Sequence, residues 1–488
     1  MPQYLRTALA ATAAAALTGG LLALSATTAS AAPAKAPGRA DADFNNDGYA
    51  DVAVSAPLAY VSGKKEAGAV TVIYGGKTAN RYATYSQNSA GVPGNAEAVD
   101  RFGSDTAFGD FDGDGYDDLA VGTPGEDVGS DQDGGSTVIL WGSASGLKGG
   151  TEVKDPRPGS HDMFGGTLEA ADFNGDHKDD LAVGTASGNT TIDVVRGGFT
   201  RTSGTGKGSY TVTPALWSGK GNGITGLHSG DVNGDGREDL IVDGFAKDDD
   251  YNANFWLPGT ASGVTTKGAQ KLPGGLITDV GDTNGDGLGD IVIGLVWDSG
   301  IAHAHTGGTA LIVKGNKAGP AGGGIQTFTQ DTAGVPGAGE KNDMFGYELD
   351  LGDVNGDGHL DLVVGAANET VNDKTGTGSV TVLYGAANGS GITGQGARFL
   401  SQDTAGVPNS DEAYDGFGGE VHVDDLDHDG RGDVVVGAAG ENDGNGAVYA
   451  LHSNTNGTLT SPAGVYTSTA GVGISGSGKP AFGFNFAD

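Results

Sequence analysis

The amino-acid sequence predicts an all-β fold, a seven-bladed β-propeller made of four-stranded antiparallel blades. An acidic motif, of which Asp110 to Asp118 is one copy, occurs seven times in the 488 residues. The copies begin 51 to 72 residues apart, and repeats of this length with several short strands are typical of propeller blades. Each motif is followed by a short apolar run rich in β-branched residues, which predicts a buried strand.

The chain begins with a segment typical of a secretory signal peptide, residues 1–31. It has a short charged start, an apolar region from Ala8 to Leu24 and small residues at a cleavage site expected after Ala31. A membrane anchor is the alternative, but this apolar run is short and rich in alanine, and no later stretch is long enough to span a membrane. We therefore expect a secreted, extracellular protein with a flexible leader at 32–42 and the propeller at 43–488.

Composition narrows the class of partner. The chain has 92 glycines without a three-residue period, which fits many turns in an all-β protein rather than collagen. Its net charge of −35 argues against nucleic acid or an anionic membrane as a partner. Because there is no cysteine, neither a disulfide nor a lipid-modified cysteine can form. An exported protein without disulfides needs another source of stability, and bound Ca²⁺ would supply it.

The acidic motif has the composition of a metal-binding loop. Positions 1, 5 and 9 are Asp and position 3 is Asn or Asp in all seven copies. Alternate oxygen-bearing side chains in a tight turn suit a hard cation, usually Ca²⁺. Position 12 is Val or Ile where an EF-hand requires Glu, so the loop joins two strands rather than two helices. Up to seven Ca²⁺ ions are expected, and hydrogen-bonded turns without metal are the alternative.

The expected metal ligands are the side chains at these four positions. They are Asp43, Asn45, Asp47, Asp51, Asp110, Asp112, Asp114, Asp118, Asp172, Asn174, Asp176, Asp180, Asp231, Asn233, Asp235, Asp239, Asp282, Asn284, Asp286, Asp290, Asp353, Asn355, Asp357, Asp361, Asp425, Asp427, Asp429 and Asp433. Position 6 is Gly in six loops, which predicts a backbone turn with positive φ, and it is His177 in the third loop. We expect that third loop to bind more weakly.

The second unit illustrates the four strands of a blade. Strands are expected at Phe102 to Phe108, Leu119 to Thr123, Ser136 to Trp141 and near Thr151 to Val153. The same third strand recurs at Ala69 to Tyr74, Thr191 to Val195, Asn254 to Leu257, Thr309 to Val313, Ser379 to Tyr384 and Ala447 to Leu451. The repeat units are expected at about 43–95 with 482–488, then 102–160, 164–220, 224–272, 275–340, 345–412 and 417–470.

A Phe-Gly pair precedes most of the acidic motifs. The pairs are Phe102-Gly103, Phe164-Gly165, Phe345-Gly346, Phe417-Gly418 and Phe482-Gly483. With these pairs the sequence resembles FG-GAP repeats, as in the seven-bladed propeller of integrin α-chains and in many secreted bacterial proteins. The resemblance implies that a backbone carbonyl at position 7 joins the four side chains around the ion. Units four and five have Ile224-Thr225 and Leu276-Ile277 instead, which predicts altered packing there.

The two ends of the repeat region complement each other. The first unit begins at its acidic motif without a preceding Phe-Gly strand, and residues 482–488 form such a strand without a motif after it. We expect this C-terminal strand to close the ring by completing the first blade. Phe482 and Phe484 are two residues apart, so both are expected to be buried on one face of the strand. A frayed tail is the alternative.

The sequence contains no recognisable catalytic motif. Neither a His-Glu-x-x-His nor a Gly-x-Ser-x-Gly pattern occurs, and there is no thiol. His303 and His305 could begin a zinc or copper site, although a solvated loop is favoured because no third ligand is evident. The tripeptide Arg431-Gly432-Asp433 lies within an acidic motif, which argues against an adhesive role for it.

The favoured function is therefore a secreted, calcium-stabilised binding module that recognises an extracellular protein or polysaccharide, as integrins recognise ligands. A monomer is expected. Long connections on the face opposite the acidic loops would carry the partner site, with Tyr60, Phe245, Tyr251 and Trp297 either as anchors or as packing residues. The alternative is a secreted hydrolase with its site on that same face, and a purely structural surface protein comes third.

Overall fold

The computed structural model describes residues 42–487, apart from 78–80, 186–189, 217–222, 246–251 and 387. The expected signal peptide, and the leader up to residue 41, lie outside the described residues. Ala42 is buried, and its carbonyl accepts the backbone N–H of Asp51 at 2.6 Å, so this last residue of the expected leader belongs to the folded part. The propeller lies within the unit that spans Lys35–Asp488.

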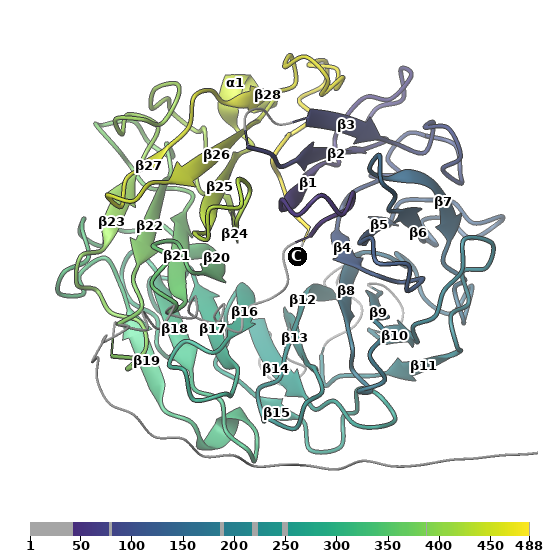
Figure 1. Cartoon of the computed structure of the whole chain (residues 1–488), viewed down its shortest axis with the longest axis horizontal. Helices are drawn as coiled ribbons and strands as arrows, with labels where there is room; N and C mark the ends of the chain where they lie inside the picture. The colour runs from purple at the N-terminus through teal and green to yellow at the C-terminus, as the bar shows by residue number, and fades with distance from the viewer. Residues whose placement is uncertain are drawn as a thin grey trace, which may run out of the picture. The chain divides into compact units, whose positions relative to one another are not determined.

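Seven small antiparallel sheets are arranged around a common centre, which confirms the predicted seven-bladed propeller (Figure 1). Five sheets have four strands, one has three and one has five, and neighbouring strands follow one another along the chain, except that the last strand of the five-stranded sheet pairs with the third. In the described part of the chain, no helix is long and apolar enough to cross a membrane. Within the described ranges there are two short helical turns, η1 (Pro320–Gly322) and α1 (Glu441–Gly444).

The blades are numbered along the chain. Blade 1 contains β1 (Asp51–Ala56), β2 (Ala69–Tyr74) and β3 (Arg81–Tyr85), and blade 2 contains β4 (Thr106–Gly109), β5 (Asp118–Thr123), β6 (Ser136–Trp141) and β7 (Lys148–Glu152). Blade 3 contains β8 (Thr167–Ala171), β9 (Asp180–Gly184), β10 (Ile192–Val195) and β11 (Ser209–Val212), and blade 4 contains β12 (Ile224–Gly230), β13 (Asp239–Phe245), β14 (Asn252–Leu257) and β15 (Gln270–Lys271). Blade 5 contains β16 (Ile277–Gly281), β17 (Asp290–Leu295), β18 (Thr309–Val313) and β19 (Ile325–Phe328). Blade 6 contains β20 (Phe345–Gly352), β21 (Asp361–Ala366), β22 (Ser379–Leu383) and β23 (Arg398–Leu400), and blade 7 contains β24 (Glu420–Asp424), β25 (Asp433–Ala438), β26 (Ala447–Ser453), β27 (Leu459–Thr460) and β28 (Val465–Tyr466).

The second and third strands form the buried middle of each blade. Runs such as Val434-Val435-Val436 in β25 are fully buried because adjacent blades cover both faces of the sheet. The third strands β2, β6 and β18 begin and end at the residues that the sequence predicted. The first strand of blade 2 is shorter than expected. Phe102-Gly103 turns rather than extends, since Gly103 has a φ of +82° and donates its N–H to Gly122 at 2.9 Å.

The Phe-Gly pairs fasten each blade to the preceding one. Phe102 is fully buried, and its backbone N–H donates to Ala67 of blade 1 at 3.0 Å. A Cβ at Gly68 would come within 2.2 Å of the Phe102 carbonyl oxygen, so glycine permits this close approach. In blade 5, Leu276 and Ile277 are half-buried, which agrees with the altered packing expected where the Phe-Gly pair is missing.

The C-terminal segment closes the ring against β1. Gly483 and Ala487 donate backbone hydrogen bonds to Ser55 at 3.1 Å and Ala53 at 3.0 Å, and Phe486 forms a bridge with Val54. The segment is a set of bridges rather than a regular strand, so the sheet of blade 1 has three named strands.

The expected burial of both aromatic rings in this segment is wrong for one of them. Phe482 is 0% exposed, but Phe484 is 52% exposed and Phe486 is buried instead. Positive φ angles at Ala481 and Gly483 interrupt the alternation of side chains that a regular strand would have.

Candidate metal loops and partner face

The seven acidic loops lie on one face of the propeller, here called the loop face, and neighbouring loops contact one another. Asp117 of the second loop accepts the backbone N–H of Asp43 at 2.8 Å, and Asp179 of the third accepts that of Asp110 at 3.1 Å. Backbone hydrogen bonds also join the third loop to the fourth, the fourth to the fifth, the sixth to the seventh and the seventh to the first. The fold therefore gathers the predicted ligand side chains along one rim.

The carboxylate at position 1 organises each loop. In every loop it accepts the backbone N–H groups of positions 5 and 6. Positions 4 and 6 have φ angles of 50° to 77° and 63° to 87°, so the backbone curls around this carboxylate. The predicted positive φ at position 6 is confirmed, and His177 adopts it at 63°.

The carboxylate at position 9 begins the second strand and is 0–1% exposed in all seven blades. One of its oxygens accepts a backbone N–H from the last residue of the third strand or from one of the two residues after it, at 2.7 to 3.0 Å. Burial raises the pKa of this carboxyl group to about 8 in Asp51, Asp118 and Asp361. Because a buried carboxylate is costly to ionise, its charged form requires a cation beside it.

The side chain at position 3 completes an acidic centre. In the second loop, carboxylate oxygens of Asp110, Asp112 and Asp118 lie within 4.8 Å of one another. One oxygen of Asp112 and one of Asp427 are buried and accept no hydrogen bond from the described residues. In the third to sixth loops position 3 is Asn and its amide lies against the carboxylate at position 9, and a half-turn of the amide would present its oxygen instead. This set of oxygens fits a hard cation.

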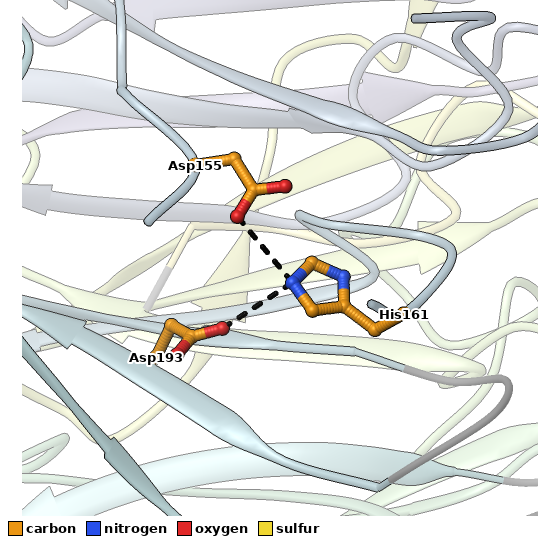
Figure 2. A group of neighbouring side chains, drawn as sticks. All are labelled: Asp155, His161 and Asp193. Carbon is orange, nitrogen blue, oxygen red and sulfur yellow. Dashed lines mark ion pairs between the residues drawn. The ribbon is translucent and has the colours of Figure 1, made fainter. Parts of the chain in front are cut away.

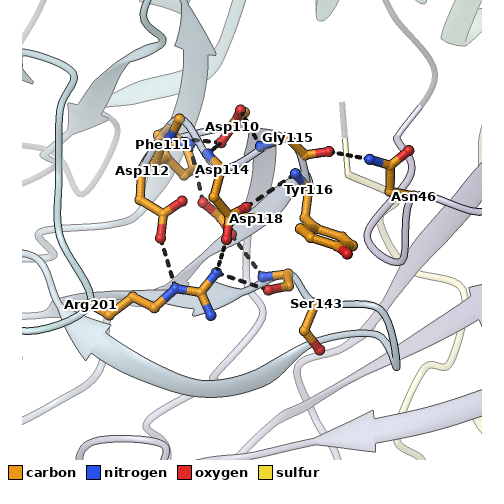
Figure 3. A network of polar contacts seen from close by, with 12 residues as sticks. Asn46, Asp110, Phe111, Asp112, Asp114, Gly115, Tyr116, Asp118, Ser143 and Arg201 are labelled. Carbon is orange, nitrogen blue, oxygen red and sulfur yellow. Dashed lines mark hydrogen bonds and ion pairs between the residues drawn. The ribbon is translucent and has the colours of Figure 1, made fainter.

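An arginine from the neighbouring blade reaches into the second loop (Figure 3). Arg201, in the β10–β11 connection, places Nε 2.7 Å from Asp112 Oδ2 and Nη2 2.6 Å from Asp114 Oδ2. The guanidinium also donates to the carbonyl of Gly142 at 3.0 Å and lies over the ring of Trp141. A protein cation therefore pairs with positions 3 and 5, which are two expected metal ligands. No local pattern reveals this pair, because Arg201 is 89 residues from Asp112 in the sequence.

A histidine contacts the seventh loop. His452 in β26 places Nδ1 2.8 Å from Asp433 Oδ2 and 3.9 Å from Asp427 Oδ2. The hydrogen bond with Asp433 raises the pKa of His452 above its ordinary value. Asp433 itself is 1% exposed and belongs to the strand β25, so the Arg-Gly-Asp tripeptide does not present its carboxylate to a partner.

A buried group of charged side chains, which the sequence analysis missed, lies where blade 2 meets blade 3. His161 Nε2 is 3.4 Å from an oxygen of Asp155 and 3.4 Å from one of Asp193 (Figure 2). Arg157 also pairs with Asp193, at 2.7 Å. Burial lowers the pKa of His161, but the two carboxylates outweigh it and raise the pKa to about 9. Two cations thus balance two carboxylates in an ion-pair network.

The opposite face, here called the link face, carries the second-to-third-strand connections and the links between blades. Gln87 in the first link donates to Glu126 in the β5–β6 connection at 2.6 Å, so these two kinds of segment share a face as expected. His303 and His305 are exposed there, as in the solvated loop that the sequence favoured. Of the expected aromatic anchors, Tyr60, Phe245 and Trp297 are half-buried, and Tyr251 lies outside the described residues.

A cavity of about 530 Å³ opens at the link-face end of the central channel. Its lining includes Tyr347, His228, Tyr414 and Phe484. Tyr414 is 72% exposed and Phe484 is 52% exposed, so two aromatic rings border the cavity. A second cavity of about 490 Å³ lies at the loop-face end and is lined by Asp172, Asp231 and Asp282, among others.

Comparison with known proteins agrees with the resemblance inferred from the Phe-Gly pairs. The FG-GAP repeat family matches five segments, residues 40–73, 102–140, 164–206, 345–383 and 417–451. These segments belong to blades 1, 2, 3, 6 and 7, in which a Phe-Gly pair is present. Blades 4 and 5 keep the four-stranded sheet although the matched segments do not include them.

Similar curated proteins fall into two groups. Mouse phosphatidylinositol-glycan-specific phospholipase D is 34% identical over 143 residues, which are 29% of this chain and 17% of that protein. Integrin alpha pat-2 of Caenorhabditis elegans is 30% identical over 240 residues, 42% of this chain and 18% of the integrin. Integrin alpha-PS5 of Drosophila melanogaster is 33% identical over 150 residues, 29% of this chain and 14% of the integrin. The matches thus span less than a fifth of these relatives, and with its five matched repeats on a seven-bladed propeller the chain is an integrin-like FG-GAP repeat protein.

Proposed function

We propose that this protein is a secreted, calcium-stabilised binding module that recognises an extracellular protein or polysaccharide through its link face. The observation that carries the proposal is the pair of exposed aromatic rings, Tyr414 and Phe484, at the mouth of the 530 Å³ cavity. Aromatic side chains offer a large apolar surface at a low entropic cost, and they are enriched at binding hot spots. A pocket with a few aromatic and polar groups on a rigid scaffold is a usual ligand site.

The distribution of apolar surface supports the same face. Among the described residues, the large hydrophobic side chains that are markedly exposed are Val99, Val128, Ile325, Tyr414 and Phe484. Ile325 lies in the outer strand β19, whereas the other four lie in links, second-to-third-strand connections or the closing segment. Apolar groups that gather on one face mark an interaction surface more often than scattered ones do.

Calcium is proposed for the loop face. Seven loops offer oxygens from positions 1, 3, 5 and 9, the carboxylate at position 9 is buried, and two position 3 oxygens lack a hydrogen-bond partner among the described residues. When bound, Ca²⁺ would neutralise these carboxylates and tie the loop to the start of the second strand. Because the loop face and the link face are opposite ends of each blade, we propose that Ca²⁺ stabilises the scaffold and the partner binds elsewhere.

The experiment uses the full chain secreted from its own signal peptide. We expect the mature protein in the culture medium with Ala32 as its first residue, measured by intact mass. The affinity for the ligand found on arrays of glycans and extracellular proteins should fall about tenfold or more in Tyr414→Ala. A tenfold fall corresponds to a loss of about 1.4 kcal/mol of binding free energy. Ile325→Ala, which removes an equally apolar exposed side chain from another face, should bind normally. Retention of the protein inside the cell, or equal binding by both variants, would contradict the proposal.

A secreted hydrolase with its site on the link face is the second candidate. The relatives named phosphatidylinositol-glycan-specific phospholipase D give it support, although the matches cover about a fifth of their length. The same array experiment separates the two candidates. A module binds its ligand and leaves it intact, whereas a hydrolase releases a product that mass spectrometry detects.

A further inference from the structure

Three carboxylates and a glutamine recur in one arrangement on the link face of blades 2, 6 and 7. In each case Gln, Glu and Asp stand 15, 5 and 2 residues before the Phe of the Phe-Gly pair. A second Glu follows the second strand of the blade, four residues after the glycine in that strand (Gly122, Gly365 or Gly437). The sets are Gln87, Glu97, Asp100 and Glu126 in blade 2, Gln330, Glu340, Asp343 and Glu369 in blade 6, and Gln402, Glu412, Asp415 and Glu441 in blade 7. We call them the link-face clusters.

The carboxylates of a cluster come close together and are mostly buried. Oxygens of Glu412, Asp415 and Glu441 lie within 4.8 Å of one another, and so do those of the blade 6 cluster. Asp415 is 3% exposed and Glu441 is 1% exposed, whereas Glu412 is exposed at the rim. The backbone N–H of Glu412 donates to the Asp415 carboxylate at 2.9 Å, and the same bond is 2.6 Å long in blade 6. The clusters of blades 6 and 7 are therefore built pockets with one side open to solvent, and in blade 2 the charges of Glu97 and Asp100 act on Glu126.

The negative charge of these clusters is not balanced within the protein. None of the nine carboxylates forms an ion pair with a lysine or arginine in the part of the chain that the structure describes. Burial, together with the neighbouring carboxylates, raises the pKa of Glu369 to about 7 and that of Asp415 to about 7. Burial also raises the pKa of Asp100, and the charge of Lys64 opposes this rise only in part, so the blade 2 cluster is the one with a protein cation nearby.

The glutamine provides a second, independent observation. Its Nε2 donates to the half-buried Glu126 at 2.6 Å in blade 2, and to the buried Glu369 at 2.5 Å in blade 6 and Glu441 at 2.6 Å in blade 7. The side chain is only 1% to 4% exposed, and in all three clusters Oε1 is buried and accepts no hydrogen bond from the described residues. A buried acceptor without a hydrogen-bond donor lowers the stability of the fold by about 1–3 kcal/mol, and such an unsatisfied oxygen occurs in all three clusters. A half-turn of the amide would direct this oxygen into the carboxylate cluster.

We propose that the three link-face clusters are divalent-cation sites, separate from the acidic loops, in which three carboxylates and the glutamine oxygen hold a hard ion such as Ca²⁺. An ion of this class takes oxygen ligands and neutralises buried carboxylates that lack a protein cation. Since Gln402, Glu412 and Asp415 belong to the link before blade 7 and Glu441 to the β25–β26 connection, the ion joins the link to the blade. The exposed Glu412 gives the ion access from solvent.

The test counts bound Ca²⁺ by equilibrium dialysis of the full chain. The variant carries Glu126→Gln, Glu369→Gln and Glu441→Gln, which keep the side-chain volume and remove three charges. The matched control carries Asp133→Asn, Asp373→Asn and Asp443→Asn, which remove three charges from exposed positions of the same three connections. We expect the variant to bind three ions fewer than the unmodified protein and the control to bind the same number. Equal numbers of bound Ca²⁺ ions in all three proteins would overturn the proposal. They would indicate that the carboxylates of each cluster share protons instead of holding a metal ion.

A second measurement keeps the test independent of the folding of the variant and of the acidic loops. Crystals of the unmodified protein soaked in Tb³⁺ should give anomalous peaks between Asp415 and Glu441 and at the equivalent positions of blades 2 and 6. Peaks confined to the loop face would overturn the proposal while leaving calcium binding by the loops intact. Asp114→Ala, which alters a loop, should leave the link-face peaks unchanged, so failure of one class of site is distinguishable from failure of the other.

Discussion

The closing segment contains two phenylalanines two residues apart, one buried and one exposed, and they provide a matched test of ring closure. Phe482 is 0% exposed and belongs to the apolar cluster between blades 7 and 1, whereas Phe484 is 52% exposed. Removing a fully buried phenylalanine ring costs about 3–5 kcal/mol through lost burial and the cavity left behind. A surface substitution of the same chemistry changes stability by about 0.5 kcal/mol or less. Phe482→Ala should therefore destabilise the protein far more than Phe484→Ala.

Both variants keep the backbone hydrogen bonds from Gly483 and Phe484 to Ser55, so the comparison isolates the rings. The entropy of unfolding is about 2.1 cal/mol/K per residue, so in a unit of this size each kcal/mol shifts the melting temperature by about 1 °C. We expect Tm to fall by about 3–5 °C for Phe482→Ala and by less than about 1 °C for Phe484→Ala. Calorimetry at a fixed Ca²⁺ concentration, with circular dichroism to verify the fold, measures both.

Equal shifts in the two variants would refute the assignment of Phe482 as the anchor of ring closure. A stronger perturbation deletes residues 480–488, which removes the anchor and the hydrogen bonds together. An open ring exposes the edge of β1, so this deletion should abolish cooperative melting, promote oligomerisation and weaken Ca²⁺ binding at the first loop. A truncated chain that stays monomeric and melts like the full chain would mean that the ring does not close in this way.

Further predictions concern the loops and the buried ion pairs. EDTA should lower Tm markedly, because a site filled at about 100 times its Kd contributes roughly 2.7 kcal/mol; an unchanged Tm with no metal bound beforehand would argue against calcium. Asp114→Ala should remove one Ca²⁺ without unfolding the ring, and metal analysis that finds none or all of the ions lost would contradict independent sites. Arg201→Met should strengthen Ca²⁺ binding at the second loop by removing a competing cation, which calorimetric titration with Ca²⁺ would detect; unaltered affinity would show that the guanidinium does not compete. His161 has its folded-state pKa raised from 6.5 to about 9, so its contribution to stability is complete below about pH 6.5 and disappears as the pH rises through 9; His161→Gln should flatten this decline in urea titrations, and an equally steep decline in the variant would assign it to other groups.

The sequence alone predicted the architecture and the loop geometry because both depend on local patterns. Seven copies of one motif set the number of blades, and the apolar run after each copy set the second strand. The turn at position 6 follows from glycine at a positive φ, so the backbone of each loop could also be anticipated. These features need no knowledge of which blades are neighbours.

Tertiary structure decided the features that depend on contacts between distant segments. Arg201 meets Asp112 across 89 residues, and His161 meets Asp193 across a blade boundary, so neither pair leaves a mark in the local sequence. The exposure of Phe484 also escaped prediction, because alternation along a strand holds only while the backbone stays extended, and Gly483 at +86° breaks it. The link-face clusters have a regular spacing in the sequence, but only the fold brings the link of one blade against the β-strand connection of the next and buries their charges together.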